Sequence, residues 1–161
     1  MPLAGGGAEP QAVLYFFYGS LRTGLINHDF LSRSFARVEN LGEFVTDSEY
    51  SLVGLASRAY PFMTAAAPPV SCNLVGAART HITGEVFALD AADGDGLRSL
   101  DALEGGYAKR QISVTRRRDG AHVVAWVYLT ENPETIASFW ENRHGRFVAV
   151  PGGDWRTFGG K

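Results

Sequence analysis

Residues 13–22 read Val13-Leu14-Tyr15-Phe16-Phe17-Tyr18-Gly19-Ser20-Leu21-Arg22. The first six are aliphatic, β-branched or aromatic, which is typical of a strand buried on both faces. The run stops at Gly19-Ser20. Glycine there lets a ligand approach the main chain, and successive N–H groups can form an anion-binding nest. A plain turn at the end of a strand explains the same pattern, so both interpretations stay open.

Ser20 itself is not predicted to be a nucleophile. The nucleophile elbow of hydrolases needs glycine two residues before and two residues after the serine. Tyr18 and Arg22 occupy those two positions.

Several further stretches have the apolar, β-branched or alternating composition of strands. They are residues 82–89, 111–115 and 123–129, with Asp119-Gly120 as a hairpin turn between the last two, and two short pieces of 43–55 around Asp47-Ser48. Gly84, inside the first of these, predicts a bulge or a close backbone approach.

Short helices are expected at 97–103, at 135–142 and after Asn27, which could cap a helix that contains Leu31. Strands outnumber helices and do not alternate regularly with them, which argues against a doubly wound sheet. We therefore predict an α+β domain with a closed or strongly curled sheet. Residues 1–11 are expected to be a mobile tail, 12–161 a single domain, and 151–161 a glycine-rich tail.

Composition excludes several functional classes. The 161 residues carry a net charge of -2, which gives no general attraction to nucleic acid or to anionic membranes. The single cysteine, Cys72, excludes an intrachain disulfide and a cysteine-only metal site. No apolar run approaches the roughly 20 residues of a membrane helix. Residues 1–11 lack the basic region of a secretory signal, so the cytoplasm is the default location.

A carboxylate ends the second apolar helical pattern. In Leu100-Asp101-Ala102-Leu103-Glu104-Gly105-Gly106-Tyr107, Glu104 follows the stripe formed by Leu97, Leu100 and Leu103. Apolar neighbours could desolvate Glu104 and raise its pKa toward neutrality, as a general acid/base requires. A solvated glutamate at a helix end is the simpler alternative, although a negative charge there is mildly unfavourable. Asp101 lies off the stripe and is expected to face solvent.

No metal or organic cofactor is expected. The four histidines, at 28, 81, 122 and 144, show no i, i+4 pair, and no calcium-loop, dinucleotide or phosphate fingerprint is present. The Arg116-Arg117-Arg118 run is most simply the solvated tip of a hairpin. Trp126 and Tyr128 share one face of a strand; core packing explains both, although Tyr128 could serve as a donor at a barrel mouth.

Taken in order, these motifs resemble the γ-glutamylcyclotransferase-like (AIG2-like) family, and most closely its γ-glutamylamine cyclotransferase branch. The resemblance rests on Tyr18-Gly19-Ser20-Leu21-Arg22, Asn27-His28, Gly84-Glu85-Val86-Phe87, Leu100–Gly105 and Tyr107, and it spans roughly residues 13–129. Gly153-Asp154-Trp155-Arg156 also resembles the tail of some bacterial members. It implies a small mixed β-barrel flanked by short helices. It also implies that Tyr18, Gly19, Ser20 and Leu21 hold the substrate carboxylate, that Glu104 is the general acid/base, and that Tyr107 and Tyr128 border the substrate.

The implied reaction is cleavage of a γ-glutamyl amide by the substrate's own α-amine, which releases 5-oxoproline and a free amine or amino acid. A non-catalytic module that binds a small molecule through the same loop is the alternative from another class. Removal of a γ-glutamyl protecting group in a biosynthetic pathway is a third reading. Glu104 favours an enzyme, whereas the two-residue Gly105-Gly106 segment, shorter than is usual in the family, favours the binding module.

Overall fold

A computed structural model describes residues 12–22, 25, 28–90 and 94–158 of the chain. The strands are β1 (Ala12–Phe17), β2 (Val38–Leu55), β3 (Pro61–Thr64), β4 (Arg79–Asp90), β5 (Ala108–Arg116), β6 (His122–Leu129) and β7 (Phe147–Ala149). The helices are α1 (Asp29–Ser34), α2 (Gly94–Leu103), α3 (Pro133–Glu141) and α4 (Trp155–Phe158), with a short 3-10 turn at Arg143–Gly145. The expected tail at 1–11 and the expected cap Asn27 lie outside the described residues.

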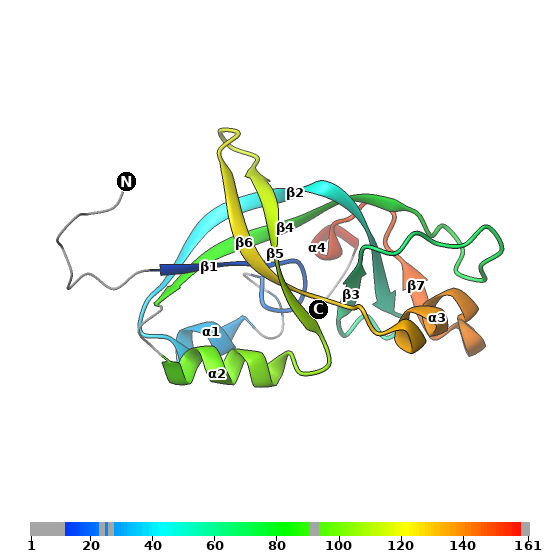
Figure 1. The fold of residues 1–161 in the computed structure, drawn as a ribbon, viewed down its shortest axis with the longest axis horizontal. Coiled ribbons are helices and arrows are strands. Elements are labelled where there is room, and N and C mark those ends of the chain that lie inside the picture. The colour runs from blue at the N-terminus through cyan, green and yellow to red at the C-terminus, as the bar shows by residue number, and fades with distance from the viewer. Residues whose placement is uncertain (1–11, 23–24, 26–27, 91–93, 159–161) are drawn as a thin grey trace.

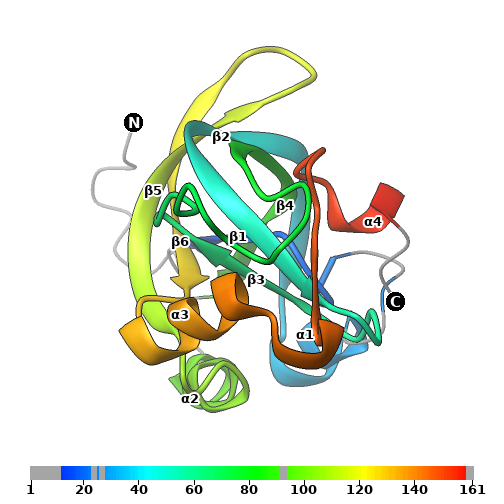
Figure 2. The ribbon, with the colours of Figure 1, turned by 90° about the vertical axis from the view of Figure 1, so that its right-hand side faces the viewer.

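Five strands close into a barrel, as Figure 2 shows end-on. Their order is β2-β4-β1-β6-β5, and β5 pairs back with β2 to complete the ring. All these pairs are antiparallel except β1–β6, which is parallel at Tyr15 and Trp126. Strands β3 and β7 extend the sheet from β2. The prediction of a small mixed β-barrel with short helices is therefore confirmed.

Strand β1 is buried on both faces because it separates two cores. Phe16 and Tyr18 pack into the barrel interior. Tyr15 and Phe17 point to the opposite face and pack with α1 and α2 residues such as Leu31. Alternation along the strand thus sends successive side chains into different apolar environments. Gly84 of β4 permits the close approach predicted for it, because a Cβ there would lie 2.5 Å from the Phe17 carbonyl oxygen.

Residues 43–55 are one continuous strand rather than two short ones. Strand β2 runs for 18 residues, and its pairing with β4 is irregular between Val45 and Glu49. At this irregularity the Thr46 hydroxyl donates to the Ser48 carbonyl (2.7 Å) and accepts from the Ile82 N–H (2.9 Å). The polar residues at 46–48 therefore form a bulge that bends the strand instead of a turn that ends it.

The prediction of a glycine-rich tail at 151–161 is wrong for residues 151–158, the part of this segment that the structure describes. Helix α4 begins at Trp155, whose side chain is fully buried. Its ring lies against Gly54 of β2, where a Cβ would meet the indole at 2.3 Å. Just before the helix, the Asp154 carboxylate pairs with the buried Arg22 at 2.8 Å. Glycine at 54 thus leaves room for a large apolar anchor that fixes the segment to the barrel.

Helices α1 and α2 lie side by side under β1 (Figure 1). They approach closely at Gly96, where a Cβ would lie 2.5 Å from the Ser34 carbonyl. Leu100 is fully buried beneath the barrel, but Leu103 is 44% exposed, so the predicted apolar stripe fades before the helix ends. Gly106 then adopts φ +95°, a conformation that favours glycine, and directs the chain into β5.

Asn132 fixes the start of α3. Its side chain accepts from the N–H groups of Glu134 (2.9 Å) and Thr135 (3.1 Å), and Pro133 follows as the first helical residue. Asn132→Ala should lower the free energy of unfolding by about 0.5–2 kcal/mol, as measured by urea denaturation. Asn132→Asp keeps the acceptor and should retain most of the stability. Equal losses in the two variants would contradict the capping role.

Candidate active site

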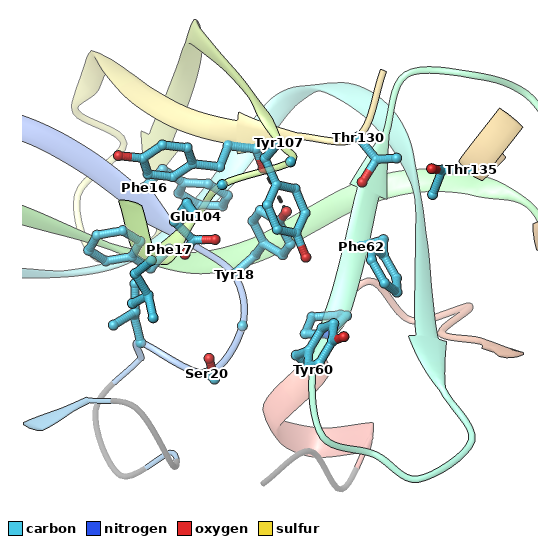
Figure 3. A pocket seen from close by; sticks show the side chains of 17 residues that line it. Phe16, Phe17, Tyr18, Ser20, Tyr60, Phe62, Glu104, Tyr107, Thr130 and Thr135 are labelled. Atoms are coloured by element: carbon cyan, nitrogen blue, oxygen red, sulfur yellow. Dashed lines mark hydrogen bonds between the residues drawn. The ribbon is translucent and has the colours of Figure 1, made fainter. Parts of the chain in front are cut away.

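A pocket of about 480 Å³ opens beside the barrel (Figure 3). It lies where the turn after β1 meets the start of β3, the loop after α2, the end of β6 and the start of α3. The structure brings all seven residues predicted from the sequence to its lining: Tyr18, Gly19, Ser20, Leu21, Glu104, Tyr107 and Tyr128.

Glu104 supplies the carboxylate of this pocket. It follows the last turn of α2, where its N–H donates to the Leu100 carbonyl at 3.0 Å. Its side chain is half-buried among aromatic residues, with Phe16, Phe17 and Tyr18 nearby in Figure 3. Removal from water disfavours the charged form, so burial raises the pKa of Glu104 from 4.5 to about 7. The group can therefore both accept and release a proton near neutral pH.

Two tyrosines beside Glu104 keep their protons at neutral pH. Burial, reinforced by the charge of Glu104, raises the pKa of Tyr107 above its ordinary value. Burial also raises the pKa of Tyr18, and the charges of Tyr107 and Glu104 add to the effect. The Tyr18 hydroxyl donates to the Tyr128 carbonyl at 2.6 Å, which joins the end of β1 to β6. Both phenols thus remain hydrogen-bond donors while Glu104 changes its charge.

The turn after β1 forms one wall of the pocket. The Arg22 N–H donates to the Gly19 carbonyl at 3.0 Å and closes the turn. Opposite it stands Pro61 at the start of β3, so close that a Cβ on Gly19 would lie 2.9 Å from the proline ring. Behind the turn, the fully buried Arg22 side chain is held by Asp154, which also caps α4 by accepting from the Arg156 N–H at 3.1 Å.

Tyr128 is a lining residue of the pocket, and its hydroxyl is engaged by Asp101. It donates to Asp101 Oδ1 at 2.6 Å, and the Lys109 ammonium lies 3.1 Å from the same oxygen. Burial opposes ionisation of Asp101, but the hydrogen bonds from Tyr128 and Lys109 outweigh it and lower the pKa of this carboxyl. Asp101 is exposed, as expected. It ties the last turns of α2 to β5 and β6 and so leaves the pocket carboxylate to Glu104.

Five further lining residues were not anticipated: Tyr60, Pro61, Phe62, Thr130 and Thr135. Pro61 and Phe62 begin the unpredicted strand β3, and Tyr60 directly precedes it. Thr130 follows β6, and Thr135 lies in the first turn of α3. Only Thr130 had a signal in the sequence, because it is a polar residue directly after the apolar strand predicted at 123–129.

Neither a metal site nor a membrane helix emerges from the described residues. Across ranges 12–22, 28–90 and 94–158, no three His, Cys, Asp or Glu side chains gather as metal ligands would. Within those same ranges no helix has both the length and the apolar character needed to cross a bilayer.

The barrel and its pocket define a small α+β protein with one desolvated carboxylate beside a glycine turn. Residues 15–157 match the family model described as "Gamma-glutamyl cyclotransferase, AIG2-like". The chain is also 30% identical over 145 residues to the "Putative gamma-glutamylcyclotransferase" of Vibrio cholerae serotype O1, with 88% of this chain and 94% of the relative covered. The chain belongs to the gamma-glutamyl cyclotransferase, AIG2-like family.

Solved structures share the fold. A mouse AIG2-like protein superposes with a TM-score of 0.60 at 23% identity, covering 78% of this chain and 83% of its own. The uropathogenic Escherichia coli protein c4763 gives 0.61 at 22% identity, covering 91% and 94%. In allophanate hydrolase from Kluyveromyces lactis the similarity covers 93% of this chain but only 21% of the hydrolase, with a TM-score of 0.56 at 15% identity. The same fold thus also occurs within a much larger protein.

Proposed function

We propose that the protein is a cyclotransferase that cleaves γ-glutamyl amides and releases 5-oxoproline and a free amine. The observation that carries this proposal is the half-buried Glu104, whose pKa burial raises to about 7, facing the glycine turn across one pocket. Membership of the family supports it. The leaving amine belongs to an amine or an amino acid.

The substrate brings its own nucleophile, so no Ser or Cys is needed. Its α-amine attacks the γ-carbonyl carbon, and a five-membered ring forms as the amide C–N bond breaks. Because the attack is intramolecular, proximity is largely supplied by the substrate. Ionised Glu104 takes a proton from the α-ammonium and then returns a proton to the departing nitrogen. One carboxyl group performs both transfers and ends in its starting state. The attacking nitrogen loses its second proton as the ring closes, and that proton ends on the released amine, which leaves as its ammonium form.

Charge in the pocket determines how the glutamyl end is held. Among the described lining residues there is no Lys, Arg or His. The α-carboxylate is therefore held by main-chain N–H groups of the turn at Gly19, Ser20 and Leu21, and these groups also face the developing oxyanion. The raised pKa of Tyr107 keeps its hydroxyl protonated as a further donor.

The direct test is a panel of γ-glutamyl amides incubated with the purified protein, with 5-oxoproline detected by mass spectrometry. Release of 5-oxoproline above the uncatalysed rate supports the proposal. Binding of 5-oxoproline without release from any amide would favour the non-catalytic module. The short Gly105-Gly106 segment does not separate the groups that turnover needs, because Glu104 and Tyr107 on either side of it line the same pocket.

The pH dependence of kcat/KM follows from the pKa of Glu104. The reaction begins with the ionised carboxylate, so protonation of the free enzyme removes the base. Burial raises this pKa to about 7, and kcat/KM should therefore fall about tenfold per unit below pH 7. Initial rates between pH 5 and 8 at low substrate concentration measure this limb. A plateau that extends down to pH 5 would contradict the assignment of Glu104 as the base.

A further inference from the structure

The half of the pocket away from Glu104 contains a buried hydroxyl that has no partner. Thr130 is 3% exposed, and among the described residues nothing forms a hydrogen bond with its Oγ1. Buried hydroxyl groups are normally paired, because an unpaired one loses its hydrogen bonds to water without replacement. Thr130 lines the pocket, and Figure 3 shows it with Thr135 across the pocket from Glu104. A bound ligand can therefore supply the missing partner.

The position of this hydroxyl is fixed by the main chain. Directly after β6, the Thr130 N–H donates to the Met63 carbonyl of β3 at 2.8 Å. The same pairing holds Thr130 beside β3, whose Phe62 lines the pocket below it in Figure 3. The hydroxyl is thus presented from a rigid edge of the sheet rather than from a mobile loop.

Aromatic rings line the pocket between Thr130 and the carboxylate: Figure 3 shows Tyr107 between them, with Phe62 and Tyr60 below. The rings of Phe62 and Tyr107 lie 6.1 Å apart, and those of Tyr60 and Phe62 lie 5.4 Å apart. A short aliphatic chain that leaves the amide nitrogen near Glu104 would pass these rings before it reaches Thr130. This path suits methylene groups that end in one polar group.

The charge balance limits that polar group to an uncharged one. Glu104 is the only acidic residue among the described lining residues, and none of them is basic. The main-chain N–H groups of the turn at Gly19 are already assigned to the glutamyl carboxylate. A second carboxylate at Thr130 would be desolvated without a cation, which is costly. An ammonium there would also be desolvated, because the single acidic residue among the described lining residues, Glu104, lies across the pocket. A hydroxyl or amide could instead both donate to and accept from Thr130.

We propose that Thr130 is a specificity-determining residue whose hydroxyl anchors an uncharged hydrogen-bonding group on the leaving amine. The inference rests on the proposed cyclotransferase function and names its substrate class: γ-glutamyl amides of short amines that carry a hydroxyl or amide. Such substrates should be preferred to amides of apolar amines and of amino acids.

Three amides of similar size test this inference: γ-glutamyl-ethanolamine, γ-glutamyl-propylamine and γ-glutamyl-glycine. In the wild-type protein, kcat/KM for the ethanolamide should exceed that of the other two about tenfold or more. Thr130→Val preserves shape and removes the hydroxyl. It should lower kcat/KM for the ethanolamide by about tenfold and leave the propylamide unchanged or improved. Thr130→Ser retains the hydroxyl and should restore the preference.

The outcomes separate this inference from the function on which it rests. If the wild-type protein releases 5-oxoproline from none of these three amides and from no other amide of the wider panel, the cyclotransferase proposal is overturned. If it cleaves other amides of the panel but none of these three, the substrate class inferred from Thr130 is overturned. If it cleaves all three with equal kcat/KM, or if Thr130→Val loses the same factor on each, only the role of Thr130 is overturned. Thermal melting of both variants shows whether a uniform loss comes from unfolding.

Discussion

Glu104→Gln protein should release 5-oxoproline from a good γ-glutamyl amide about 10²- to 10⁴-fold more slowly than the wild-type protein. Glutamine has nearly the same shape and can hydrogen-bond, but it cannot take a proton from the α-ammonium or return one to the leaving nitrogen. The loss should appear in kcat, while affinity for 5-oxoproline changes little. Single-turnover rates and calorimetric titration measure the two quantities separately.

Stability measurements provide the control for this variant. Folding raises the pKa of Glu104 from 4.5 to about 7, so the folded state binds a proton that the unfolded state releases between these values. The stability that this proton contributes is present below about pH 4.5 and is lost as the pH rises through 7. Glutamine carries no such dependence.

The difference in melting temperature between Glu104→Gln and the wild-type protein, taken as variant minus wild type, should therefore be larger at pH 8 than at pH 4.5. A folded variant that cyclises the amide at the wild-type rate would remove Glu104 from the mechanism. An unchanged difference in melting temperature across this pH range would show that the carboxylate is not desolvated.

Gly19→Val should abolish detectable binding of 5-oxoproline in a calorimetric titration. A Cβ at this position would lie 2.9 Å from Cδ and 3.0 Å from Cγ of Pro61, so any side chain forces the turn and β3 apart or fills the space between them. The main-chain N–H groups proposed to hold the carboxylate would then be shielded or displaced. Ser20→Ala leaves the main chain accessible and should weaken binding less.

A glycine elsewhere gives a matched control. A Cβ on Gly152 would meet nothing within 4 Å among the described residues, and its backbone does not require glycine. Gly152→Val should therefore leave both binding and melting temperature unchanged. If folded Gly19→Val binds 5-oxoproline as tightly as the wild-type protein does, the turn is not the carboxylate site.

The parts of the site that could be predicted from the sequence are those encoded locally. Tyr18–Leu21 follows an unmistakable apolar strand, and Glu104 lies between a helical stripe and a glycine pair, so each was found without knowledge of its partners. The family resemblance then placed them in one pocket. Tyr107 lies three residues from Glu104 and came with it.

The opposite wall could not be predicted because long-range pairing creates it. Thr130 is placed by a main-chain hydrogen bond to Met63. Phe62 is presented by the four-residue strand β3, which pairs with β2, and Tyr60 directly precedes that strand. No local periodicity encodes such contacts. The sequence likewise suggested a break at Asp47-Ser48, but pairing of the surrounding strand with both β4 and β5 carries it through these polar residues.

Trp155 shows a different reason for failure. Its stretch resembles the tail of some family members, but a single aromatic residue among glycines produces no periodicity that predicts burial. That burial depends on the absence of a side chain at Gly54, about a hundred positions earlier.

The pair formed by Arg22 and Asp154 determines when, during synthesis of the chain, the binding site can form. These residues are separated by 132 positions, yet their contact supports the turn that borders the pocket. Strand β1 is likewise flanked by β4 and β6, both distant in the chain. Closing such long loops is slow relative to local folding. During synthesis on a ribosome, the chain therefore cannot complete its binding site until residues near Asp154 have emerged. Until β4 and then β6 have emerged, the aromatic residues of β1 lack their strand partners, and exposed apolar surface of this kind favours aggregation.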